Sequence, residues 1–186
     1  MPVKVNEKKL YESVDAAANI AREALRAVAK EAVETLVGAS QVWSGSYLAS
    51  HRVAVGETTP TITEGPTDMR RFSRIDKGQI QHGNFLPDKL GEMEIQNLQM
   101  QVEAKLNQKL DAGINSLPNG IGVVKIGNSI SHADIVEQGS IPMNVPVYAV
   151  YHATIFHIRM FAKQITATIK QRVAMSMSFR IRGNFK

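Results

Sequence analysis

Cysteine is absent from this sequence. Its absence excludes disulfide bridges, cysteine-ligated zinc and thiol catalysis, and it is compatible with a reducing cytosol. A long apolar run is also missing, because the most apolar later stretch, residues 145–162, is interrupted by His152, His157 and Arg159. The first residues carry charge but no apolar segment followed by a cleavage site, so they predict no secretory signal. We therefore expect a soluble protein with no membrane partner.

Acidic residues are absent from the last part of the chain. After Glu137 there is no Asp or Glu, whereas Lys and Arg residues give this part a charge of +7. The first 137 residues carry 15 basic and 17 acidic residues, a net charge of −2. A basic end of this kind can bind nucleic acid, but it can equally bind an acidic neighbouring subunit.

The composition that remains is that of a folded protein. Hydrophobic residues make up 44% of the chain and charged residues 21%, near the average for soluble folded proteins. A length of 186 residues is sufficient for one domain with a core, or for a domain that carries long arms. We predict a single domain over residues 1–186, with a long loop or hairpin excursion over residues 56–87 and a basic C-terminal arm over residues 174–186.

Three segments have hydrophobic residues at spacings of three and four, which predicts amphipathic helices over about residues 6–36, 88–112 and 151–173. The first helix would be about 45 Å long, and Gly38 is a plausible signal for its end. The residues expected on the buried sides of the three helices are Leu10, Val14, Ala17, Ala21, Leu25, Val28, Ala32 and Leu36; Leu90, Leu98, Val102, Leu106 and Leu110; and Ile155, Ile158, Ile165, Ile169 and Val173.

Shorter segments rich in β-branched and aromatic residues predict strands over residues 47–55, 122–127 and 133–138. The tail 174–186 alternates in part and is interpreted as a strand or an ordered arm. The fold class that we predict is therefore α+β, with a long N-terminal helix and a small antiparallel sheet of about three to five strands packed by two further helices.

The sequence gives little support for a catalytic, metal or cofactor site. No two of the five histidines, His51, His82, His132, His152 and His157, have the i, i+4 spacing of helical metal ligands. A metal site assembled from distant residues stays an alternative, but ordinary surface or half-buried histidines are favoured. The segment NGIGVVKIGN lacks the third glycine of a dinucleotide fingerprint and leads into a strand. We therefore predict no cofactor and no enzymatic activity.

Several polar and aromatic residues have two interpretations each. Ser44, Gly45 and Ser46 favour a turn over a nucleophilic serine, because no G-x-S-x-G motif is present. Trp43 and Tyr47 favour core or rim packing over a base-stacking platform. Glu137 is either a solvated carboxylate at a strand end or a partner for an arginine of the same or a neighbouring chain.

Two short motifs and the order of the predicted elements resemble one protein family. Residues 43–53 read W-S-G-S-Y-L-A-S-H-R-V, which resembles a family pattern tGxLxxSxxV that follows a long N-terminal helix. A second pattern, I-x-N-x-x-x-YA-x-x-x-E-x-G, is similar to Ile126, Asn128, His132-Ala133, Glu137 and Gly139. The family is that of the neck and tail-completion proteins of tailed bacteriophages, the minor tail component family of lambdoid and related phages. Departures are Gln41-Val42-Trp43-Ser44 in place of Pro-Val-Asp before the first glycine, and His132 in place of an aromatic residue.

This resemblance implies a virion structural protein in the neck or tail, assembled in the host cytoplasm. Such a protein forms a homo-oligomeric ring that joins the portal connector to the tail tube or tail terminator protein around the DNA channel. The residues that we expect at subunit or partner interfaces are Trp43, Tyr47, Glu137, Arg172, Arg180 and Arg182. Packaged DNA in the channel would be contacted by Arg180, Arg182 and Lys186.

The alternative function is a small basic DNA-binding protein that uses the C-terminal region. Its binding would weaken steeply with salt, because each neutralised phosphate releases counterions. A third possibility, an enzyme, is disfavoured because no acid–base or nucleophile pair can be named.

Overall fold

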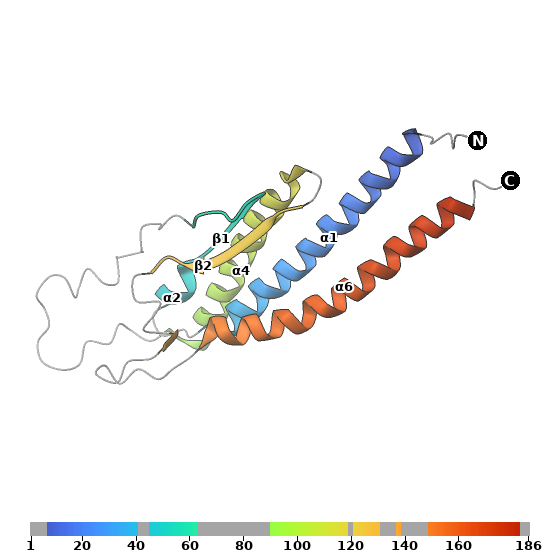
Figure 1. The fold of residues 1–186 in the computed structure, drawn as a ribbon. Coiled ribbons are helices and arrows are strands. Elements are labelled where there is room, and N and C mark those ends of the chain that lie inside the picture. Colours follow the sequence, from blue (N-terminus) through green and yellow to red (C-terminus); the bar gives the residue numbers. More distant parts are fainter. Residues whose placement is uncertain are drawn as a thin grey trace, which may run out of the picture.

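The computed structural model describes residues 7–40, 45–62, 90–118, 121–130, 137–138 and 149–182. Its elements follow the order α1 (Glu7–Ala39), α2 (Ser46–Ala49), β1 (His51–Gly56), α4 (Glu92–Asn115), β2 (Val123–Asn128) and α6 (Val150–Arg182). The strands, α2 and α4 form a small body against the C-terminal part of α1, and α1 and α6 run antiparallel beyond it (Figure 1). The predicted α+β class and the long N-terminal helix are therefore confirmed.

Helix α1 has its buried residues in its C-terminal third. Val33, Leu36 and Val37 are almost fully buried, and the helix ends at Ala39, one residue after the predicted stop at Gly38. The predicted apolar stripe does not stay buried toward the start of the helix, since Val14 is 54% exposed.

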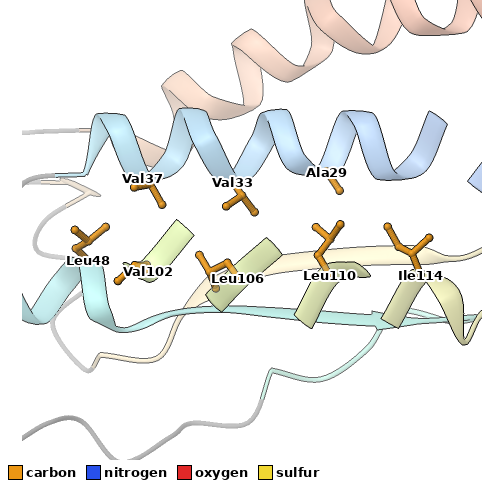
Figure 2. Close-up of a cluster of buried hydrophobic side chains, with 8 residues drawn as sticks. All are labelled: Ala29, Val33, Val37, Leu48, Val102, Leu106, Leu110 and Ile114. Atoms are coloured by element: carbon orange, nitrogen blue, oxygen red, sulfur yellow. The ribbon is translucent and has the colours of Figure 1, made fainter. Parts of the chain in front are cut away.

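Helix α4 supplies the opposite half of the main core. It begins at Glu92, four residues later than predicted, where the Glu94 carboxylate accepts a hydrogen bond from the Gly91 N–H over 2.9 Å. Figure 2 shows its buried side chains pointing at those of α1. The residues of this cluster are Ala29, Val33, Val37, Leu48, Val102, Leu106, Leu110 and Ile114.

The sheet is a two-stranded antiparallel ribbon within the described residues, rather than the three to five strands expected. The register pairs Val53 with Ile126 and Val55 with Val124, and these four side chains pack against the core cluster. The strand predicted to start at Tyr47 begins only at His51, because residues 46–49 form α2. Most of the strand predicted over 133–138 lies outside the described residues, and its last two positions are helical.

Helix α6 packs along α1 and is longer than its periodicity predicted. It continues to Arg182, so residues 174–182, expected as a strand or an arm, continue the helix, while residues 183–186 lie outside the described part of the chain. Thr154 is buried and Ile158 half-buried, but Ile155, predicted to face inward, is 48% exposed. None of the described helices combines the length and apolarity that crossing a membrane requires.

Polar contacts fix α1 against its two neighbours. The Asp111 carboxylate of α4 lies 2.8 Å from Lys30 Nζ and 3.0 Å from Arg26 Nε, and these two cations hold the pKa of Asp111 below its usual value. On the other side, His157 of α6 lies 2.7 Å from the Glu31 carboxylate. These pairs are partly exposed, so they select the helix register more than they stabilise the fold.

Candidate functional site

A polar cluster occupies the point where the end of α1, α2, both strands and the start of α6 meet. Its central residue is His51, of which 2% is exposed, and Ser40 and Tyr47 are each 6% exposed. Polar side chains at this depth are stable only when their hydrogen bonds are satisfied. The members of the cluster are Ser40, Tyr47, His51, Asn128, Glu137 and Tyr151.

The hydrogen bonds around His51 define its tautomer. Ser40 Oγ donates to the Leu36 carbonyl over 2.6 Å, so the Ser40 hydroxyl accepts from His51 Nε2, which lies 2.8 Å away. His51 Nδ1 then has a free lone pair and accepts from the Tyr151 hydroxyl over 2.9 Å. His51 is therefore neutral with its proton on Nε2, and the two tyrosine rings of the cluster meet its ring edge to face.

Asn128, at the end of β2, connects the sheet to α2. Its amide group donates to the Tyr47 carbonyl over 2.8 Å and lies 3.3 Å from His51 Nδ1, and its Oδ1 accepts from the Ile130 N–H over 2.9 Å. These contacts hold the chain that leaves β2 against the turn between α2 and β1.

Glu137 connects Tyr47 to the start of α6. Its Oε1 accepts from the Tyr47 hydroxyl over 2.7 Å, and its Oε2 accepts from the Tyr151 N–H over 3.0 Å. A carboxylate that binds an N–H in the first turn of a helix satisfies an unpaired donor and interacts favourably with the helix dipole. The side chain is 12% exposed, so it is not a solvated carboxylate, and no arginine among the described residues of the same chain pairs with it. Pairing with an arginine of a neighbouring chain stays a prediction.

Burial in the cluster shifts the acid–base equilibria of three of its members. Burial lowers the pKa of His51 to about 4, and the neighbouring charge of Arg52 adds to this effect. Burial also raises the pKa values of Tyr47 and Tyr151, and the negative charge of Glu137 raises both further. At neutral pH the histidine is therefore uncharged and both tyrosines keep their protons.

The Ser40–His51–Tyr151 array has the order of a hydrolytic triad but not its proton arrangement. A nucleophilic serine needs a base with a free lone pair, yet His51 Nε2 carries a proton and the Ser40 proton goes to a backbone carbonyl. The third member, Tyr151, donates to the histidine instead of accepting from it. The cluster connects five elements, and the hydrogen bonds of its described side chains join these elements to one another.

Other residues singled out in the sequence lie away from this cluster or outside the described residues. Arg172 Nη1 lies 4.0 Å from a Glu23 carboxylate oxygen at the surface. Arg180 and Arg182 belong to α6, but their side chains are outside the described part of the structure, as are Trp43 and Lys186. Among the described residues, no three His, Asp or Glu side chains are grouped so that they could hold a metal ion.

Ser40 and Tyr151 were missed by the sequence analysis, and His51 was treated as an ordinary histidine. The hydrogen-bonded pairs His51–Tyr151 and Tyr47–Glu137 are separated by 100 and 90 residues, so no local spacing reveals them. The one available signal was that Tyr47, Asn128 and Glu137 all lie in the two motifs of the resemblance.

Comparisons with protein-family models, with characterised proteins and with solved structures find no match for this chain.

Proposed function

We propose that this chain is a structural subunit of the neck of a tailed-phage virion. Copies of it assemble into a ring that joins the portal connector to the tail tube or tail terminator protein, and DNA passes through the channel of the ring. The proposal begins from the resemblance of residues 43–53 and 126–139, and two features of the structure support it.

The observation that carries the proposal is the incomplete burial of the two long helices. Helices α1 and α6 have 33 residues each, about 50 Å, and the core lies at one end of them. We call residues 11–28 of α1 together with 158–172 of α6 the helical extension. No side chain described in the helical extension is buried, and its apolar residues, such as Val14, Ile20 and Ile165, remain half-exposed or exposed, whereas Leu25 packs against the edge of the core cluster.

Each helix of the pair turns only one side toward the other, and Tyr11, Val14 and Met160 remain exposed, so the helical extension offers apolar residues for a further surface to cover. Subunits of a closed ring supply such a surface to one another, and each copy does so at the same place. A structural subunit that reaches complete burial only on assembly accounts for a helix length that the body itself does not use.

The second supporting feature is the way in which the residues of the resemblance meet. Tyr47 and Asn128 contact each other, and Tyr47 contacts Glu137, although these residues come from separate motifs. Their hydrogen bonds fix the start of α6 to the body. The motif residues therefore fix the orientation of α6, which is a structural role.

A phage that carries this gene with an early stop codon tests the proposal. We expect DNA-filled heads and separate tails to accumulate, and we expect purified protein added to such an extract to join them into infective particles. Complete, infective virions formed without the protein would contradict the proposal.

A second candidate function is DNA binding, which the continuous helix α6 favours. It carries Arg159, Lys163, Lys170, Arg172, Arg180 and Arg182 over 33 residues without any acidic residue. If it binds duplex DNA, log Kd changes with log salt concentration by about 0.9 per phosphate contacted. The double variant Arg180→Ala/Arg182→Ala then loses binding, whereas Lys105→Ala/Lys109→Ala on α4 does not. If the protein is a neck subunit, Arg180→Ala/Arg182→Ala impairs ring formation or tail attachment instead.

A further inference from the structure

Near its start, α6 carries two exposed apolar side chains on the side turned away from α1. Phe156 is 72% exposed and Met160, one turn later, is 53% exposed. At about 100° per residue, the opposite side of the helix is the one that holds Thr154, Ile158 and Ile165 against α1. The packing of this chain therefore leaves Phe156 and Met160 uncovered.

Unpaired cations lie along one edge of these two side chains. Arg159 and Lys163 are exposed on the same side of the helix, and neither forms an ion pair with any residue that the structure describes. Helix α6 has no acidic residue of its own that could pair with them. We call Phe156, Arg159, Met160 and Lys163 the α6 patch.

Helix α4 carries a surface of similar form and opposite charge. Met93 is 77% exposed and Met100, two turns later, is 60% exposed. Glu92 and Glu103 lie along one edge of the two methionines and, within the described residues, form no ion pair. We call Glu92, Met93, Met100 and Glu103 the α4 patch.

The two patches lie on different sides of the molecule. Figure 2 shows α1 between α4 and α6, so the two helices that carry the patches are in separate layers. A patch on one layer therefore meets the other patch only when it belongs to another molecule.

We propose that the α6 patch of one copy binds the α4 patch of a second copy, an inference that rests on the proposed ring function. Each patch combines two large apolar side chains with two unpaired charges, and the charges of the two patches have opposite sign. Methionine adapts its shape to a partner surface, and opposite charges at the rim of an interface fix its register and exclude like-charged partners. Because the two patches differ, the contact is head-to-tail, and repeating it closes a ring when the rotation between copies permits.

Charge reversal on each side separately tests this contact. The α4-reversed chain carries Glu92→Lys/Glu103→Lys, the α6-reversed chain carries Arg159→Glu/Lys163→Glu, and a third chain carries all four changes. We expect sedimentation velocity to show self-association at least about tenfold weaker for each of the first two chains alone. The chain with all four changes should regain the assembly of the natural chain, since every contact then again joins opposite charges. An equimolar mixture of the first two chains should associate more strongly than either chain alone, because contacts between unlike chains join opposite charges, but it can close only rings with an even number of copies.

Matched variants control for total charge. Lys105→Glu/Lys109→Glu changes the charge of α4 outside its patch by the same amount as the α6 reversal. Glu34→Lys/Glu57→Lys does so for the α4 reversal, at two exposed residues that lie outside both patches and outside the helical extension. Both should assemble like the natural chain, and far-ultraviolet circular dichroism should show the same helix content in all variants.

The possible failures have different meanings. If the natural chain assembles but the reversed chains assemble equally well, this contact is wrong while the ring proposal stands. The same holds if the chain with all four changes does not regain assembly. If the natural chain stays monomeric at low salt and high concentration, the self-contact is wrong, and the head–tail joining experiment decides the proposed function separately.

Discussion

His51 is a buried base whose two ring nitrogens already have partners. Ser40 accepts from Nε2 and Tyr151 donates to Nδ1, and the contact at Nδ1 requires the neutral ring. A second proton on the ring would turn the Nδ1 acceptor into a donor facing the proton of Tyr151. The hydrogen bonds therefore reinforce the effect of burial, which also disfavours the charged form.

The protonation of His51 makes the stability of the fold depend on pH. In the unfolded chain the imidazole has a pKa near 6.5, whereas in the folded chain it is about 4, so the unfolded state binds more protons between these values. Stability should therefore fall as pH drops below about 6.5, by about 2 kcal/mol at pH 5 and by about 3 kcal/mol once pH is below 4. Urea unfolding followed by circular dichroism at pH 7, 6 and 5 measures this loss.

Two histidine variants separate His51 from the other titrating groups. His51→Gln should lower stability at pH 7 and reduce the difference between pH 7 and pH 5 by the part that His51 contributes. His152→Gln replaces an 82% exposed side chain that lies 4.0 Å from Glu137 and serves as the comparison variant. The pH dependence should fall more in the His51→Gln chain than in this one. An unchanged pH dependence in the His51→Gln chain would show that His51 is not the responsible group.

Two helical glycines differ in the space that surrounds them. A Cβ atom added at Gly38, near the end of α1, would have no atom within 4 Å. A Cβ added at Gly113 of α4 would lie 2.6 Å from Val55 Cβ, because the helix packs directly on β1 there. The first glycine only lowers helix propensity, whereas the second permits the close approach of helix and strand.

The same substitution should therefore have opposite effects at these two sites. Gly38→Ala should stabilise the chain by about 0.5–1 kcal/mol, because alanine restricts the unfolded state and favours the helix. Gly113→Ala should destabilise it by about 1–3 kcal/mol, because α4 must move away from Val55. Thermal and urea unfolding of the two variants measure both changes. Equal effects of the same sign would mean that α4 does not lie this close to β1.

The helices could be predicted from the sequence because the residues that they bury recur at a regular local spacing. Val102, Leu106 and Leu110 follow helical spacing within α4, and the structure buries all three. This spacing does not show how much of the apolar side of a helix another element covers. Val14 of α1 was therefore expected to be buried, but it is exposed. Tyr47 was placed in a strand from its β propensity, but it packs from α2 with Leu36 in a cluster that the local sequence does not define.

The candidate site was less predictable than the helices, because each of its contacts joins distant segments. The motifs containing Tyr47 and Glu137 could be recognised, but their hydrogen bond depends on the whole path of the chain between them. One partner of His51 directly follows α1 and the other lies at the start of α6, and the relative placement of these two helices follows from the fold alone.

At the scale of the whole molecule, stability is distributed unevenly along the two long helices. Leu36 and Val37 of α1 are buried, whereas no side chain described in the helical extension is. Contacts across the helical extension include the surface pair Arg172–Glu23, which contributes little free energy. Local opening should therefore require less free energy there than in the body.

Hydrogen exchange measured by mass spectrometry should reveal this gradient. In the isolated chain we expect the slowest exchange in peptides that cover residues 29–37 and 102–114, and faster exchange toward Tyr11 in α1 and Arg172 in α6. In the assembled ring the helical extension should gain protection of about tenfold or more, because neighbouring copies cover its half-exposed residues. The peptide 102–114 serves as the internal reference, since its residues are already buried in one chain. If the isolated chain protects its helical extension as strongly as this reference, the two helices are stable without a partner and the main structural support for the ring is lost.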